Sequence, residues 1–202
     1  MPDHPSPSIT ALILAGGQAS RMGGNDKGLL DCAGQPLIER VLARVTPCVD
    51  GILISANRNL DQYRHYGHPV LADTMPDFPG PLAGIARGLE QCATDWLWVV
   101  PCDAPQVEAQ LLARLMAACY AQKVTAAVPV ENTQMQATFA LLHREALASL
   151  RDYLEQGRRA VRDWLRDLPA AQVDCSDHPE WFININTPED LAACAVQWQD
   201  NP

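Results

Sequence analysis

The sequence predicts an α/β protein, a three-layer sandwich in which helices cover both faces of a mainly parallel sheet. Short, nearly continuous apolar runs alternate with longer segments whose apolar residues recur at helical spacing. Strands buried on both faces have this continuous apolar character, and strand–helix alternation is typical of right-handed crossovers between parallel strands. Apolar residues make up 48% of the 202 residues and charged residues 19%, which is the composition of a folded globular protein.

The first two thirds of the chain carry the clearest strand and helix patterns. Five apolar runs are predicted to be strands, at 9–15, 51–56, 70–72, 96–100 and 125–130. Helical spacing between them predicts helices at 36–45, 82–92 and 108–121. Pro36 and Pro81 stand where the first turn of a helix tolerates proline.

The remaining third is predicted to complete the same domain. Strands are expected at 136–143 and 170–175, and helices at 144–155 and 158–168. The segment Thr187-Pro188-Glu189-Asp190 has the pattern of a capped helix start and is expected to open a last helix. No linker or repeat divides the chain, so we expect one domain over 9–196 after a flexible tail, 1–8.

Charge and composition exclude several classes of partner. The formal net charge is -9, and no cluster of Lys or Arg offers a surface for neutralising the phosphates of a nucleic acid. The N-terminus lacks the features of a secretory signal, and no apolar run approaches the roughly 20 residues that cross a membrane. Seven scattered cysteines without a CxxC pair fit reduced thiols packed in the core. We therefore expect a cytoplasmic protein that binds neither nucleic acid nor membrane.

The most informative segment follows the first predicted strand, where residues 14–30 read LAGGQASRMGGNDKGLL. Ligands of parallel α/β sheets bind beyond the carboxyl ends of the strands. Gly16 and Gly17 allow backbone N–H groups to approach an anion closely, and Arg21 and Lys27 add two cations. This combination indicates a triphosphate-binding loop, whereas the alternative is a surface loop whose glycines merely turn the chain.

Two familiar phosphate-binding loops do not fit this segment. A Walker A loop requires Ser or Thr after its lysine, but Gly28 follows Lys27. A dinucleotide-binding fingerprint requires GxGxxG, and the spacing around Gly16 and Gly17 differs.

Asp103 is the candidate metal ligand. It follows the apolar run 96–100 and is flanked by Pro101 and Pro105, which hold it in a defined orientation. Mg²⁺ prefers hard oxygen ligands and often takes only one or two of them from protein. The alternative role is that of a helix N-cap, which aspartate also favours.

The pattern LAGG-x-x-SRMGG-x-DKGLL resembles the signature of the molybdenum cofactor guanylyltransferase family, within the Rossmann-like, GT-A-like nucleotidyltransferases. The similarity extends through 51–59, 71–73, 79–85, 101–105 and 185–191, and so covers about 9–195. It implies that Asp103 binds both the nucleotide and Mg²⁺. It also implies nucleotide contacts by Leu14, Ala15, Gly16, Lys27, Asn57 and Asp73.

Three further candidates acquire a role through this resemblance. The Asp73 carboxylate could accept hydrogen bonds from guanine or from ribose, and Asn57 offers both a donor and an acceptor but could equally be a turn residue. Gly80, Pro81 and Leu82 look like a helix opening whose free N–H groups could face an anion or a base carbonyl, or simply a plain helix start.

Asn184 and Asn186 are expected on one face of a short strand within 182–187. The resemblance suggests that they line the side of the site that binds the acceptor. Backbone capping before the last helix is the alternative.

The resemblance implies transfer of GMP from GTP to a molybdopterin-type cofactor, with Mg²⁺ as the metal and pyrophosphate as the leaving group. Arg21 and Lys27 would balance charge on the phosphates, and Asp103 would hold the metal. We expect a monomer that contacts cofactor-supplying proteins or molybdoenzymes transiently. The alternatives are a cytidylyltransferase, a sugar-phosphate nucleotidyltransferase, and a non-catalytic nucleotide-binding protein of the same fold.

Overall fold

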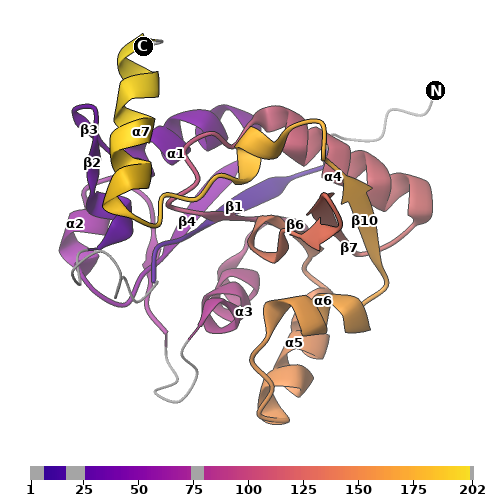
Figure 1. Cartoon of the computed structure of the whole chain (residues 1–202). Helices are drawn as coiled ribbons and strands as arrows, with labels where there is room; N and C mark the ends of the chain where they lie inside the picture. Colours follow the sequence, from indigo (N-terminus) through magenta and orange to yellow (C-terminus); the bar gives the residue numbers. More distant parts are fainter. Residues whose placement is uncertain (1–6, 17–25, 74–79, 201–202) are drawn as a thin grey trace.

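A mainly parallel sheet with helices on both faces organises the computed structural model, which describes residues 7–16, 26–73 and 80–200 (Figure 1). The sheet has the order β10-β7-β9-β6-β1-β4-β5, and β8 pairs with β7. The predicted fold class is therefore confirmed. The strands are β1 Ile9–Leu14, β4 Gly51–Ser55, β5 Val70–Leu71, β6 Trp96–Pro101, β7 Ala126–Glu131, β8 Gln134–Met135, β9 Leu141–His143 and β10 Ala170–Asp174.

Strand direction divides the sheet into parts. Strands β5, β4, β1 and β6 run parallel, as do β7 and β10. Strand β9 lies between β6 and β7 and is antiparallel to both, and β8 is antiparallel to β7. A small antiparallel pair, β2 (Asp31–Cys32) and β3 (Gln35–Pro36), lies apart from this sheet.

Helices cover the sheet in two layers. They are α1 Leu37–Val45, α2 Leu60–Arg64, α3 Pro81–Gln91, α4 Ala109–Gln122, α5 Ala146–Glu155, α6 Val161–Asp167 and α7 Pro188–Asp200. In Figure 1, α1 and α4 lie above the sheet, and α3, α5 and α6 lie below it. None of the described helices is both long and apolar enough to cross a membrane.

Alternation along β1 shows how the two layers are held. Ala11 and Ile13 join the core beneath α1 and α4, whereas Leu12 points into the core against α3. Both sets are buried, which is why this strand reads as a continuous apolar run. The seven cysteines are free, and six of them are buried, as expected of small core residues.

Several parts of the chain differ from the predicted elements. Residues 136–143 were predicted as one strand, but they form a 3₁₀ turn, η4 (Ala137–Phe139), followed by the three-residue β9. Helix α2 was not predicted, because a single turn is too short to show helical periodicity.

Candidate active site

A cavity of about 700 Å³ opens at the carboxyl ends of three neighbouring parallel strands. Leu14 at the end of β1 pairs with Ser55 of β4 on one side and with Pro101 of β6 on the other. Segments that follow these strands therefore meet at one edge of the sheet, where ligands of such folds bind.

Most of the predicted nucleotide-binding residues line this cavity. They are Leu14, Ala15, Gly16, Lys27, Asn57, Asp73, Gly80, Pro81 and Asp103. Leu82 is different, because its side chain is only 2% exposed and packs in the apolar core. Only the backbone of Leu82 is thus left for a ligand. Gly17 and Arg21 fall outside the described residues.

Lys27 joins two segments that are far apart in the sequence. It lies in the 3₁₀ turn η2 (Lys27–Leu29), and its Nζ is 3.0 Å from Asp103 Oδ2. The same ammonium group donates to Asn186 Oδ1 at 2.5 Å. The Lys27 and Asp103 side chains are 22% and 14% exposed, so this ion pair is shielded but reachable from the cavity.

The structure excludes the helix N-cap role for Asp103. The next helix, α4, begins only at Ala109. The backbone carbonyl of Asp103 accepts a hydrogen bond from the N–H of Ile185 at 2.9 Å, and its carboxylate faces Lys27.

The strand predicted within 182–187 is wrong. A 3₁₀ turn, η5 (Pro179–Phe182), is followed by irregular chain up to α7, so Asn184 and Asn186 do not share a strand face. The N–H of Asn186 bonds to the Asp190 side chain at 2.9 Å instead of to a neighbouring strand. Of the two asparagines, Asn186 is the one whose side chain reaches Lys27.

Helix α7 begins with the predicted reciprocal cap. Thr187 Oγ1 accepts from the N–H of Asp190 at 3.1 Å, and Asp190 Oδ2 accepts from the N–H of Thr187 at 2.9 Å. Hydrogen bonds from the N–H groups of Asn186 and Thr187 lower the pKa of Asp190. The cap thus fixes the backbone of Asn186 next to Lys27.

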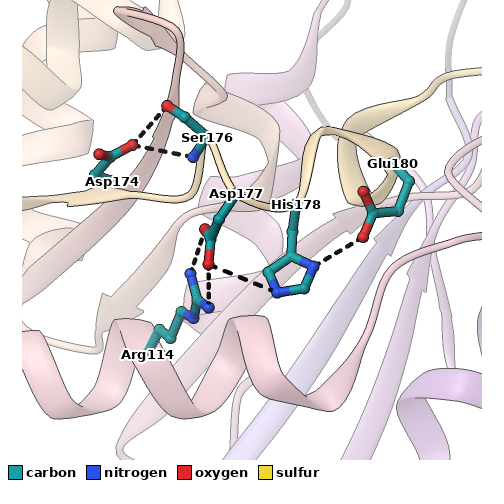
Figure 2. A network of polar contacts seen from close by, with 6 residues as sticks. All are labelled: Arg114, Asp174, Ser176, Asp177, His178 and Glu180. Atoms are coloured by element: carbon teal, nitrogen blue, oxygen red, sulfur yellow. Dashed lines mark hydrogen bonds and ion pairs between the residues drawn. The ribbon is translucent and has the colours of Figure 1, made fainter.

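The segment before Asn184 is tied to α4 by charged side chains (Figure 2). Arg114 of α4 forms two hydrogen bonds with the Asp177 carboxylate, each 2.7 Å long, and thereby lowers the pKa of Asp177 to about 2. His178 Nδ1 lies 2.8 Å from Glu180 Oε1, and its ring stacks on Trp181 at 4.1 Å. These contacts hold the turn that leads to Asn186.

Asn57 and Asp73 form a reciprocal pair on the wall of the cavity. Asn57 Nδ2 donates to Asp73 Oδ2 at 2.7 Å, and the N–H of Asp73 donates to Asn57 Oδ1 at 2.8 Å. Asp73 Oδ1 is buried without a hydrogen-bond partner among the described residues. A buried acceptor without a donor is costly, so a ligand that donates here would bind favourably.

The cavity floor depends on close packing of α3 against β4. A Cβ atom on Gly84 would overlap the Ser55 hydroxyl and approach Leu14 Cδ2 to 3.3 Å. Gly80, directly before the helix, has a φ of 134°, which side-chain-bearing residues rarely adopt. Glycine at both positions brings the N-terminus of α3 to the cavity.

The sequence of the chain matches those of known proteins from one family. Residues 11–173 match the MobA-like NTP transferase domain. A protein of Vibrio campbellii named molybdenum cofactor guanylyltransferase is 45% identical over 183 residues, which are 90% of this chain and 92% of its own. A protein of the same name from Cupriavidus necator is 46% identical over 188 residues, 91% of this chain and 94% of its own.

The chain belongs to the molybdenum cofactor guanylyltransferase family. The resemblance inferred from the glycine-rich signature and the predicted nucleotidyltransferase class are both confirmed. A molybdopterin-guanine dinucleotide biosynthesis protein A from Archaeoglobus fulgidus superposes with a TM-score of 0.79 at 22% identity, covering 95% of this chain and 99% of its own. A cytidylyltransferase from Thermus thermophilus superposes with a TM-score of 0.72 at 19% identity, covering 93% and 98%. At these identities the two structures show the shared fold.

Sequence reasoning assigned no contact with the nucleotide to several residues that line the cavity of this guanylyltransferase-family chain: Asp26, Ser55, Arg58, Cys102 and Thr138. Asp26 stood within the quoted signature, next to Lys27, and received no role. Ser55 looked like an ordinary strand residue. Thr138 lies in η4, and no local pattern marked it.

Proposed function

We propose that this chain transfers a guanylyl group from GTP to a molybdopterin-type molybdenum cofactor, releasing pyrophosphate. The observation that carries the proposal is the Lys27–Asp103 pair, which lines a cavity at the ends of β1, β4 and β6. The names of the relatives support the base and the acceptor.

The cavity offers separate groups to the two parts of the nucleotide. The backbone after β1 at Ala15 and Gly16, together with Lys27, would bind phosphate oxygens. Asp73 Oδ1 would accept from the N–H groups of guanine or from a ribose hydroxyl, because its other oxygen is already bound to Asn57.

A divalent metal fits the residues of this site. Two hard oxygens lie against the positive charge of Lys27, the Asp103 carboxylate and the Asn186 amide oxygen. Among the described residues, no group of three or more Asp, Glu, His or Cys side chains is arranged so that it could hold a metal ion. This set matches Mg²⁺, which takes few protein ligands and completes its shell with phosphate and water. When bound, Mg²⁺ would neutralise phosphate charge.

The transfer requires one displacement at the α-phosphorus. A phosphate oxygen of the acceptor forms the new P–O bond, the bond to the bridging α–β oxygen breaks, and pyrophosphate leaves with that electron pair. The attacking oxygen is already anionic, so the reaction needs no general base. Lys27 would stabilise the charge that grows on the leaving group, and Asn186 and Asp103 keep its ammonium oriented. Arg21, which belongs to the same glycine-rich stretch of the sequence, is proposed to assist.

The proposal is tested by replacing Asp103 with alanine and measuring pyrophosphate release with GTP, molybdenum-loaded molybdopterin and Mg²⁺. We expect the turnover number to fall by a factor of about 10²–10³, while the circular dichroism spectrum is unchanged. Asp167→Ala, which removes an exposed carboxylate paired with Arg158, is the control and should retain activity. Wild-type turnover of Asp103→Ala would contradict the metal role, and better use of CTP than GTP would contradict the base assignment.

A further inference from the structure

Asp26 is a charged residue in a buried position directly before Lys27. Its side chain is only 4% exposed. Oδ1 accepts from the Tyr63 hydroxyl at 2.5 Å, and Oδ2 accepts from Asn59 Nδ2 at 3.0 Å. Arg58 Nε lies 3.7 Å from Oδ2. Burying a carboxylate is costly unless hydrogen bonds and charge compensate, so this network stabilises the position of Asp26.

Tyr63 is the central donor of the network. It lies in α2, is fully buried, and belongs to the core beneath α1 and α4. Burial and the neighbouring acidic groups raise the pKa of its phenol well above the usual value, so the hydroxyl remains a donor at every physiological pH. Tyr63 is not part of the cavity lining, in contrast to Asp26 and Lys27.

The turn that carries Lys27 is held against the same tyrosine. The carbonyl of Asp26 accepts from the N–H of Leu29 at 3.1 Å, which closes the turn. Gly28 packs so closely that a Cβ atom would lie 2.6 Å from Tyr63 Oη and 3.2 Å from Cys102 Sγ. Cys102 is the residue before Asp103. The turn therefore packs against both the tyrosine and the segment that carries the proposed metal ligand.

We propose that Tyr63 and Asn59 are positioning residues of the transfer reaction, which hold the Asp26 carboxylate and thereby set the position of Lys27 relative to Asp103. Neither residue is among those that line the cavity, and both act through the turn at 26–29. The inference rests on the proposed function, because it assumes that Lys27 binds the phosphates. Displacing a reacting group by about 1 Å can lower its rate by a factor of about 10². Loss of the hydrogen bonds that Tyr63 and Asn59 donate to Asp26 should therefore slow the reaction.

The first test removes the single hydroxyl by Tyr63→Phe and measures kcat/KM for GTP by pyrophosphate release. We expect a loss of about tenfold or more, the scale for removing a group that orients a ligand. Tyr66→Phe is the matched control, since Tyr66 is the neighbouring tyrosine, at 6.5 Å between ring centroids, with its own raised pKa from burial. The control should change kcat/KM by less than about twofold, within the effect of an ordinary surface substitution.

The second test decides whether Tyr63 acts through Lys27. In a double-mutant cycle, Tyr63→Phe is measured in wild type and in Lys27→Ala, and GTP affinity is followed by calorimetry in the same four proteins. We expect the effect of Tyr63→Phe to vanish in the Lys27→Ala background. An equal effect in both backgrounds, or a wild-type kcat/KM for Tyr63→Phe, would overturn the inference.

The two proposals fail in different ways. Wild-type turnover of Lys27→Ala would refute its role in the proposed function, whereas a defective Lys27→Ala beside a normal Tyr63→Phe would refute the positioning role alone. If Tyr63→Phe melts below the assay temperature, Asn59→Gly replaces it. This variant removes the amide donor and keeps the left-handed backbone, since Asn59 has a φ of 51°. A wild-type kcat/KM for Asn59→Gly would then overturn the inference.

Discussion

Substitution of Gly28 by alanine would place a methyl group against the hydroxyl of Tyr63. The new Cβ would lie 2.6 Å from Tyr63 Oη, whereas ordinary contacts begin at 3.4 Å. It would also lie 3.2 Å from Cys102 Sγ. Gly28 is buried and its φ is not positive, so steric overlap is the main cost of this change.

The magnitude follows from the two ways in which the overlap can be relieved. Retaining the tyrosine in place leaves an overpacked core, which costs about 1–3 kcal/mol. Moving the tyrosine breaks its bond to the Asp26 carboxylate, and a hydrogen bond to a charged group contributes about 1.5–3 kcal/mol. We therefore expect Gly28→Ala to lower the free energy of unfolding by about 2 kcal/mol, and Tyr63→Phe by a similar amount.

The double variant separates this mechanism from a general loss of stability. Without the Tyr63 hydroxyl there is no oxygen for the methyl group to overlap, so the double variant should be nearly as stable as Tyr63→Phe alone. The interaction free energy should be about 1–2 kcal/mol, measured by urea denaturation with a constant m-value. Gly28→Ala combined with Tyr66→Phe should be additive. Additivity of Gly28→Ala with Tyr63→Phe within about 0.5 kcal/mol would refute the reasoning.

Two further predictions concern the segment that holds Asn186. Thr187→Val removes the side-chain cap of α7 and should lower the free energy of unfolding, measured by urea denaturation, by about 0.5–2 kcal/mol. Thr187→Ser keeps the hydroxyl and should retain most of the stability. Equal losses in the two variants would contradict the role of the cap. The Arg114 ion pair lowers the pKa of Asp177 from 3.8 to about 2, so its contribution to stability is complete above pH 3.8 and is lost as the pH falls through about 2. Unfolding free energies measured against pH should show this loss in wild type and a smaller one in Arg114→Gln, and parallel curves would count against it.

The sheet was predictable because its central strands are buried on both faces. Strands β1, β4 and β6 form continuous apolar runs, and each was predicted to within one residue of its observed end. The apolar run at 136–143 was wrongly predicted to be one strand for the same reason, because a largely apolar run is typical of a buried strand. Most of its residues are apolar, including two of the three in η4, although only Leu141–His143 pair with neighbouring strands.

The residues placed at the cavity by sequence reasoning are those that follow parallel strands. Carboxyl ends of such strands converge on one edge of the sheet, so Gly16, Asn57, Asp73 and Asp103 could be grouped without coordinates. Their roles in binding remain predictions.

Contacts between distant segments were out of reach of any local pattern. Lys27 and Asn186 are 159 positions apart, and Asp26 and Tyr63 are 37 apart. Tyr63 lies in a helix of one turn, and Asn186 lies in irregular chain whose alternating apolar residues imitate a strand. Such pairs depend on how whole elements pack against one another, and this packing cannot be read from a local sequence pattern.

The antiparallel insertion of β9 has a consequence for how the domain opens. Strands β7, β8 and β10 join the rest of the sheet through Leu141–His143, which pair with β6 on one side and with β7 on the other. Detaching these three residues would cost both halves their pairing at once. We therefore expect amide exchange in β6, β7 and β9 to report one shared opening event. In this event, pairing through β9 couples the strands on the β6 side and those on the β7 side into a single cooperative unit.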